Sequence, residues 1–213
     1  LPLWAGAAIF FGILPPLRTQ TRFTFAGDMQ NVQRGMVARI AGRSYAIEAE
    51  LHSPEGGAEG VIVANADFIG GFGLWVDSDG LLHHTYSLLG VETYRQVAEQ
   101  PLPAGEVTVR MLFESETPTP GSGGEVTLFV DGERVGGGRM PKTVPVAFTS
   151  YAGMDISRDN GLVVDRAYED KAPYAFTGTV HKVVFDLSPE DHETERTLHA
   201  EAMSHTLGHG AAG

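Results

Sequence analysis

Apolar and polar residues alternate along much of the chain, which is the pattern of half-buried β-strands. The clearest case is residues 44–52 (SYAIEAELH), and residues 107–113 (VTVRMLF) repeat it. One face of the first strand would be apolar and the other acidic: Tyr45, Ile47, Ala49 and Leu51 against Ala46, Glu48 and Glu50. Further runs rich in β-branched and aromatic residues predict strands at 59–64, 73–77, 81–87, 125–130, from Arg134 onward and at 174–187.

Turn residues separate these strands. Asp79-Gly80 and Asp131-Gly132 each lie between two strand-like runs, which predicts two β-hairpins. The three glycines at 136–138 would let a strand bend or another backbone approach closely. With 27 glycines and 12 prolines in 213 residues, the chain fits many short strands better than a helical bundle.

The sequence therefore predicts an all-β fold, an antiparallel two-sheet sandwich of the lectin-like jelly-roll type. We expect residues 44–52 and 174–187 to be antiparallel neighbours, because pairing the first and last long strands protects a sheet edge. The predicted domain covers residues 44–188. An apolar lead-in and joining segment, 1–43, precedes it, with 18–43 irregular, and a C-terminal helix and tail, 189–213, follow it.

The two terminal segments have distinct compositions. Residues 4–14 (WAGAAIFFGIL) are apolar but shorter than the ~20 residues that cross a bilayer, and Pro15-Pro16 follows them. We expect residues 1–17 to dock on protein rather than to anchor in a membrane. Residues 189–207 predict a helix, with Pro189 at its first position, acidic residues in its first turn and Gly208 at its end.

The amino-acid composition argues against several classes of function. A formal net charge of −12 argues against nucleic-acid binding and against docking on anionic membranes. The absence of cysteine excludes disulfides, zinc–thiolate sites and cysteine nucleophiles. Neither a G-x-S-x-G nor a P-loop motif occurs, so no cofactor is predicted. The sequence assigns no cellular compartment.

Carboxylate pairs are the first candidates for chemistry. Glu48 and Glu50 would point to the same side of one strand, at a separation compatible with glycoside hydrolysis. Glu114 and Glu116 border a loop in a similar way. The simpler interpretation of both pairs is a solvated sheet face, so no catalytic residue is assigned.

Three further groups could bind a metal ion. The adjacent His83 and His84 point to opposite faces of a strand, so they cannot readily share a metal. His205 and His209 are one helical turn apart in the tail. Residues 155–161 place oxygen ligands at alternating positions, like part of a calcium loop, but Arg166 occupies the position where an EF-hand needs glutamate. A capped turn is favoured there, and no metal is predicted.

Two other clusters have a functional and a structural interpretation. The Gly70-Gly71-Phe72-Gly73 run could cradle phosphate, but we expect it to let a strand pack against a close neighbour. Trp75, Tyr86 and Tyr94 could form a glycan-binding platform, or they could be core residues, as most large aromatics are.

Several short blocks, taken in order, resemble a known family. They are GVIVAN (60–65), GGFGLWV (70–76), HTY (84–86), LG (89–90), PLPAG (101–105), VR (109–110), GEVTLFVDG (124–132), GRMPKTVP (138–145) and PYAFTGTV (173–180). In this order the chain is similar to the C-terminal region of large bacterial arylsulfatases of the alkaline phosphatase superfamily, from residue 43 to 187.

The resemblance implies an accessory domain without a catalytic one. Sulfatases of that type carry Cys-x-Pro-x-Arg or Ser-x-Pro-x-Arg, whose first residue becomes formylglycine. This chain has no cysteine, and no serine is followed two residues later by proline. No catalytic residue carries over, and we expect no hydrolysis of aryl sulfates by the isolated chain, although the parent protein would be a sulfuric ester hydrolase.

Two functions follow from these observations. The leading expectation is a non-catalytic accessory β-sandwich that supports or assembles a sulfatase-type catalytic unit, so that its partner is that catalytic domain or a second copy of itself. The alternative is a lectin-like module that presents glycans, including sulfated ones. Neither nucleic acid nor a membrane is an expected partner.

Overall fold

The fold is an antiparallel β-structure in a computed structural model that describes residues 20–67, 70–145, 147–148 and 152–189. The all-β expectation is confirmed, and a short 3₁₀ helix, η1 (Arg166–Lys171), is the only helix in these ranges. The strands are β1 (Arg22–Ala26), β2 (Tyr45–Ser53), β3 (Gly60–Asp67), β4 (Gly70–Val76), β5 (Leu81–Leu88), β6 (Glu92–Pro101), β7 (Gly105–Ser115), β8 (Gly124–Val130), β9 (Glu133–Met140), β10 (Met154–Ile156) and β11 (Thr179–Leu187).

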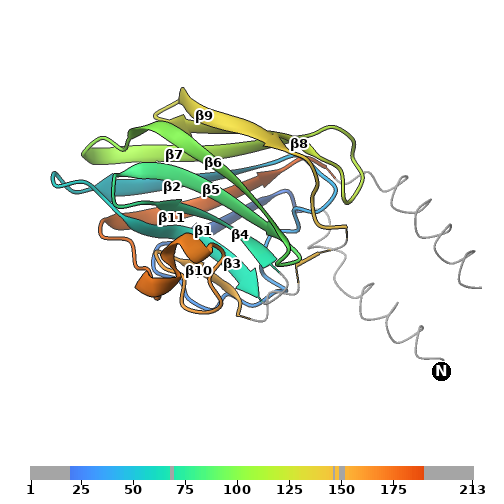
Figure 1. The fold of residues 1–213 in the computed structure, drawn as a ribbon, viewed down its shortest axis with the longest axis horizontal. Helices are drawn as coiled ribbons and strands as arrows, with labels where there is room; N and C mark the ends of the chain where they lie inside the picture. The colour runs from blue at the N-terminus through green and yellow to red at the C-terminus, as the bar shows by residue number, and fades with distance from the viewer. Residues whose placement is uncertain (1–19, 68–69, 146, 149–151, 190–213) are drawn as a thin grey trace, which may run out of the picture.

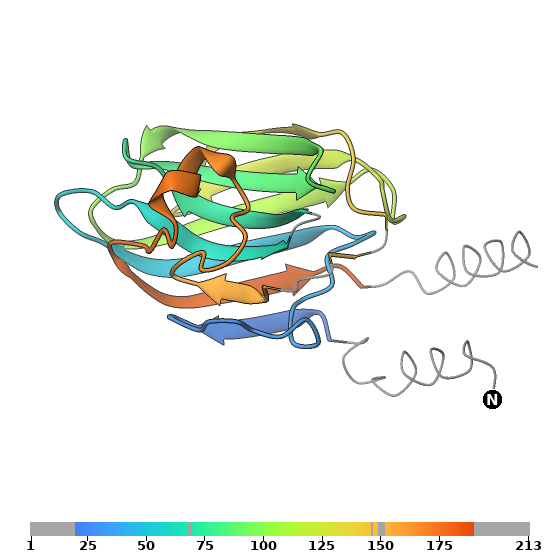
Figure 2. The same cartoon turned by 60° about the horizontal axis from the view of Figure 1, so that its bottom comes forward.

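Hydrogen bonding joins all the named strands into one continuous sheet, so the two separate sheets expected from the sequence are not confirmed. The order is β1-β11-β2-β7-β8-β9-β6-β5-β4-β3-β10, and every named pair is antiparallel. The link between β6 and β9 is a single residue pair, Ala98 with Gly136. At this link the sheet turns back on itself, so that β3, β4 and β5 lie across the core from β11 and β2 (Figures 1 and 2).

The two ends of this sheet also approach one another. The segment after β1 reaches β10, where the amide of Val32 donates to the carbonyl of Met154 at 2.8 Å and receives the reciprocal bond at 3.0 Å. The amide of Ile156 donates to the carbonyl of Met29 at 2.7 Å. The sheet is therefore nearly closed into a barrel, which leaves little unpaired edge.

The main core fills the space inside this curved sheet. On β2, the four side chains predicted to face inward are buried, each exposing 2% or less: Tyr45, Ile47, Ala49 and Leu51. Phe185 of β11 packs edge-on against Phe25 of β1 at 5.8 Å and against Phe72 of β4 at 6.0 Å between ring centroids. The core thus joins strands that are distant in the sequence and lie on opposite sides of the molecule.

The predicted pairings and hairpins are confirmed. β2 and β11 are antiparallel neighbours, with Ile47 opposite Phe185. β4 and β5 flank Asp79-Gly80, and β8 and β9 flank Asp131-Gly132, where both residues have positive φ, 49° and 82°. Positive φ at both central positions is the geometry of the tight hairpin turn that Asp-Gly favours.

The glycine runs mark close approaches between strands, as expected. A Cβ added to Gly136 would lie 2.5 Å from the carbonyl oxygen of Val97, where β9 meets β6. At the start of β4, a Cβ on Gly71 would lie 2.1 Å from the carbonyl oxygen of Asn65. Any larger residue would force these strands apart, so both runs have a structural role.

The structure also corrects the sequence analysis. The segment 18–43, expected to be irregular, contains β1, which pairs with β11 along its whole length. β6 and β10 were not predicted: β6 is polar and mostly exposed, and β10 has only three residues. Residues 1–17 lie outside the described residues, as does the expected helix 189–207 apart from Pro189.

Candidate functional site on the outer face of β4, β5 and β6

A second, smaller hydrophobic cluster lies on the outside of the sheet. The chain between β10 and β11, which includes η1, covers the outer face of β3 and β4 (Figure 1). Trp75 of β4 is central: its ring lies 5.0 Å from that of Tyr168 and is stacked on His83 at 4.0 Å with an interplanar angle of 19°. The cluster comprises Val61, Ala64, Ala66, Trp75, Val164, Tyr168 and Tyr174.

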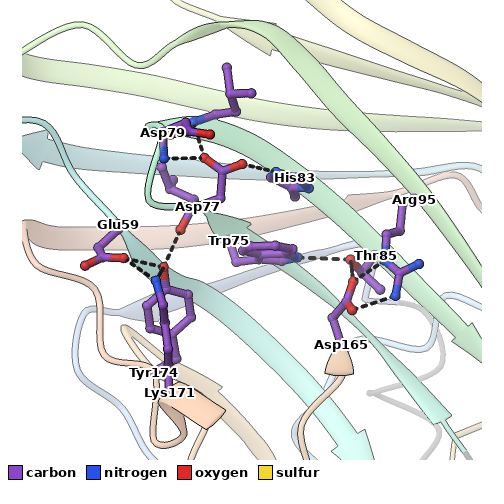
Figure 3. A network of polar contacts seen from close by, with 12 residues as sticks. Glu59, Trp75, Asp77, Asp79, His83, Thr85, Arg95, Asp165, Lys171 and Tyr174 are labelled. Atoms are coloured by element: carbon purple, nitrogen blue, oxygen red, sulfur yellow. Dashed lines mark hydrogen bonds and ion pairs between the residues drawn. The ribbon is translucent and has the colours of Figure 1, made fainter. Parts of the chain in front are cut away.

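Asp165 joins the covering segment to the sheet. Its side chain is fully buried and accepts from Arg95 Nε at 2.6 Å and Arg95 Nη2 at 2.7 Å (Figure 3). The Thr85 hydroxyl donates to it at 2.8 Å and the Ala167 amide at 2.9 Å. Burial raises the pKa of this carboxyl, but the hydrogen bonds from Arg95, the Ala167 amide and Thr85 outweigh burial, so the pKa of Asp165 lies below its ordinary value.

Arg95 is fixed in orientation yet open to solvent. Its side chain is 44% exposed although two of its donors are bound to Asp165. A guanidinium has five N–H donors, so three remain, and no partner for them is found among the described residues. Thr85 is opposite Arg95 on the adjacent strand, and its hydroxyl also accepts from the Trp75 indole at 3.0 Å.

The outward-facing residues of β6 form a strip beside the covering segment. Every second residue of this strand points outward and is exposed: Thr93, Arg95, Val97 and Glu99. Val97 is 39% exposed and pairs with His83 on β5. The strip therefore offers a hydroxyl, a fixed guanidinium and an aliphatic side chain in a row.

Two further acid–base pairs lie on the same outer face around Trp75, with the Lys171–Glu59 pair on the opposite side of Trp75 from Arg95 (Figure 3). His83 Nε2 is 2.8 Å from Asp77 Oδ2, and the other oxygen of Asp77 accepts from the amides of Asp79 and Leu81. Lys171 Nζ donates to Glu59 Oε2 at 2.8 Å, and the hydroxyl of Tyr174 donates to the same oxygen at 2.7 Å. Each potentially positive group here is thus matched by a carboxylate.

The carboxylate pairs suggested by the sequence lie elsewhere, on the outside of the other half of the sheet. Glu48 pairs with Arg110 at 3.2 Å, Glu50 pairs with Lys182 at 2.7 Å, and Glu116 pairs with Arg139. These are partly exposed ion pairs between strands and loops. The interpretation of a solvated sheet face is confirmed.

The two adjacent histidines point to opposite faces, as predicted. His83 stacks on Trp75 on the outer face, whereas His84 is completely buried on the inner face with its Nδ1 2.7 Å from Gln96 Oε1. Burial lowers the pKa of His84 to about 4, because the charged imidazolium would lose its hydration. His205 and His209 lie outside the described residues.

The calcium-like stretch 155–161 is a hydrogen-bonded turn. Asp155 accepts from the amides of Asn31 at 2.7 Å and Asn160 at 3.0 Å. Asp159 accepts from the Val164 amide at 3.0 Å and the Tyr168 hydroxyl at 2.8 Å, and burial raises its pKa. In the described part of the chain, no three His, Asp or Glu side chains are arranged to hold a metal ion.

The alternative of an aromatic platform is excluded, and the interpretation as core residues is confirmed for Trp75 and Tyr86. Trp75 is 4% and Tyr86 1% exposed, and the Tyr86 hydroxyl accepts from the Val144 amide at 2.8 Å inside the core. Tyr94 is half-buried and bonds to Glu92. Sequence reasoning missed Arg95 and Asp165, which are 70 positions apart and belong to no motif.

Comparison with known proteins identifies similar folds only. No protein-family model matches the chain, and no curated protein sequence matches it. The carbohydrate-binding module CBM40 of the Ruminococcus gnavus IT-sialidase, solved with α2,3-sialyllactose, has a TM-score of 0.48 and 11% identity over 78% of this chain and 89% of that one. Mouse laminin α1 domains LG4-5 give a TM-score of 0.48 and 14% identity over 78% of this chain and 41% of that one. The Caenorhabditis elegans galectin LEC-6 has a TM-score of 0.41 and 13% identity over 78% of this chain and 95% of that one.

The described residues contain no helix of the length and apolar character needed to cross a bilayer. At identities this low and TM-scores below one half, the similar structures assign no function, and the sulfatase resemblance finds no counterpart among them. The function is therefore inferred from the side chains on the outer face of β4, β5 and β6.

Proposed function

We propose that this chain is a non-catalytic carbohydrate-binding module that holds a sugar on the outer face of β6, at Arg95. The observation behind the proposal is that the Arg95 side chain is fixed in orientation and also exposed. It is held by two hydrogen bonds to a buried carboxylate, yet 44% of it is open to solvent. We also propose that the two halves of the curved sheet correspond to the two layers of a lectin-like jelly roll.

A sugar ring matches this strip chemically. Its hydroxyl and ring oxygens can accept from the free N–H groups of Arg95, and its C–H surface can lie on Val97. Because Asp165 fixes the guanidinium before binding, little side-chain entropy is lost when the ligand arrives. Such a surface binds without needing a deep cavity.

Asp165 and Asp77 are suited to support and not to catalysis. Glycoside hydrolysis needs two carboxyl groups that flank the bond, one as acid and one as base or nucleophile. Asp165 is enclosed by donors, and Asp77 accepts from two amides and from His83. Every oxygen of these two carboxylates is already engaged by at least one hydrogen-bonding partner.

The test is glycan-array binding followed by calorimetry on the full chain, with two matched variants. Arg95→Ala should weaken binding by about tenfold or more, the usual scale for losing a charged hydrogen-bond donor. Arg110→Ala is the control, because Arg110 is a similarly exposed arginine (41%) paired with Glu48 on the other half of the sheet. Absence of glycan binding by the unmodified chain, or equal losses in both variants, would refute the proposal.

An accessory role in assembly is the second candidate, and one turn favours it. The β5–β6 turn places Leu89 at φ 53° and Gly90 at φ 67°, with Leu89 48% and Val91 84% exposed. Leucine in this left-handed conformation costs about 1–2 kcal/mol, and asparagine or glycine is the usual choice. A strained, exposed apolar tip is typical of a protein contact.

This turn would dock the sulfatase-type catalytic unit that the sequence resemblance implies. The test is sedimentation velocity of the full chain with a purified formylglycine-sulfatase catalytic domain, repeated with the Leu89→Asn variant. A complex that the variant weakens supports the accessory role. A chain that sediments alone, or a complex that Leu89→Asn leaves unchanged, rejects this turn as the docking surface.

A further inference from the structure

We infer that the Arg95 site selects uncharged sugars over sulfated or carboxylated ones, because Asp165 already neutralises the guanidinium. This inference rests on the proposed function and names the ligand class of the same site. It departs from the sequence-based alternative, which included sulfated glycans.

The ion pair is complete before any ligand binds. Arg95 Nε and Nη2 lie 2.6 and 2.7 Å from the two oxygens of Asp165 in a two-point contact. An anionic sugar at Arg95 would therefore meet a pair with no net charge. It would lose part of its hydration and would lie close to a buried carboxylate, whose field is poorly screened by solvent.

Asp165 acts only through Arg95. A carboxylate has about four lone-pair positions. Arg95 occupies two, and Thr85 and the Ala167 amide occupy the others, so the carboxylate has no position left for a sugar hydroxyl. Asp165 is thus a positioning residue, and the ligand contacts come from the remaining donors of Arg95.

The surrounding charges do not restore a positive field. The nearby His83 faces Asp77, and Lys171 faces Glu59. The remaining cation of η1, Arg166, is outnumbered by Glu169 and Asp170. Further along β6 the outward position is acidic, at Glu99. The local balance is therefore neutral to negative, in line with the chain's formal net charge of −12.

The experiment is an array of neutral oligosaccharides, each printed beside its sulfated and sialylated forms, with calorimetry on the best matched set. We expect the unmodified chain to bind the neutral form about tenfold or more tightly than either anionic form. Asp165→Asn removes the compensating charge and should reduce this ratio to about one or invert it. Binding of the neutral sugar should be nearly independent of salt, because no net charge is neutralised.

The outcomes separate the two claims. Preference of the unmodified chain for an anionic form, or binding that weakens steeply with salt, would overturn the selectivity while leaving the glycan-binding function intact. No binding to any printed glycan would overturn the proposed function and the selectivity with it. If Asp165→Asn does not fold, as judged by circular dichroism, the unmodified chain alone tests the selectivity. The two readouts are then its ratio of affinities for neutral and anionic sugars and the salt dependence of its binding.

Discussion

The molecule has two hydrophobic clusters of different character, one inside the curved sheet and one outside it. The inner core is almost wholly apolar, and its buried polar atoms include some without a partner, such as His84 Nε2 and the Tyr45 hydroxyl. The outer cluster is small and aromatic, and it borders carboxylates that accept several hydrogen bonds, Asp165 above all. The inner core supplies stability, whereas the outer cluster orients side chains that face solvent.

The largest effect should come from the inner core. Phe185→Ala removes a fully buried ring that touches Phe25 and Phe72, and it should destabilise the fold by about 3–5 kcal/mol through lost contacts and the cavity left behind. Urea unfolding followed by circular dichroism measures this. A loss under about 1 kcal/mol would mean that the two halves of the sheet do not depend on this contact.

The buried histidine should make stability depend on pH. Its folded pKa of about 4 is below the ordinary 6.5, so the unfolded chain takes up the proton first. The contribution of the neutral His84 to the free energy of unfolding is complete above pH 6.5. It falls by about 3 kcal/mol in total as the pH drops towards 4.

Unfolding free energies of the unmodified chain and of His84→Gln, measured at intervals across that range, isolate this contribution. The variant lacks the titrating imidazole, so its stability should fall less with acid. Identical pH profiles for the two proteins would contradict the assignment of His84 as a neutral core residue.

The outer cluster should be less costly to disturb. Asp165→Asn leaves Arg95 without its counter-ion, and we expect a loss of about 1–3 kcal/mol, reduced by the exposure of the guanidinium. The fluorescence of Trp75, which is linked to Asp165 through Thr85, should change in the folded state. If Asp165→Asn costs as much as Phe185→Ala, the outer cluster is a second core and not a support for a surface.

The smallest expected effect is a gain in the stability of the fold. Leu89→Asn relieves a positive φ of 53° at the β5–β6 turn and should stabilise the chain by about 0.5–1 kcal/mol. Thermal unfolding would show a higher midpoint. A lower midpoint would indicate that the Leu89 side chain makes contacts that stabilise the fold.

The two clusters also differ in how well the sequence predicts them. Alternation in residues 44–52 defined the inward face of β2, and the Asp-Gly pairs located two hairpins, because these features depend on neighbouring residues. The outer cluster depends on contacts between distant positions, such as Thr85 and Asp165, 80 residues apart. Its covering segment is irregular and carries no periodic pattern. β6 was missed for a related reason: apart from the buried Gln96 and Ala98 and the half-buried Tyr94, its residues face solvent, so no apolar alternation marks the strand.

The most direct test of the account is a titration of the ¹⁵N-labelled full chain with the tightest-binding neutral oligosaccharide, followed by amide chemical shifts. The account predicts shift changes concentrated on the outer face of β6, at Thr93, Arg95 and Val97, and on facing β5 residues such as Thr85. The amides of Glu48 and Arg110, on the outside of the other half of the sheet, should not move. Shifts centred on those residues, or no shifts at saturating sugar, would contradict a carbohydrate site at Arg95.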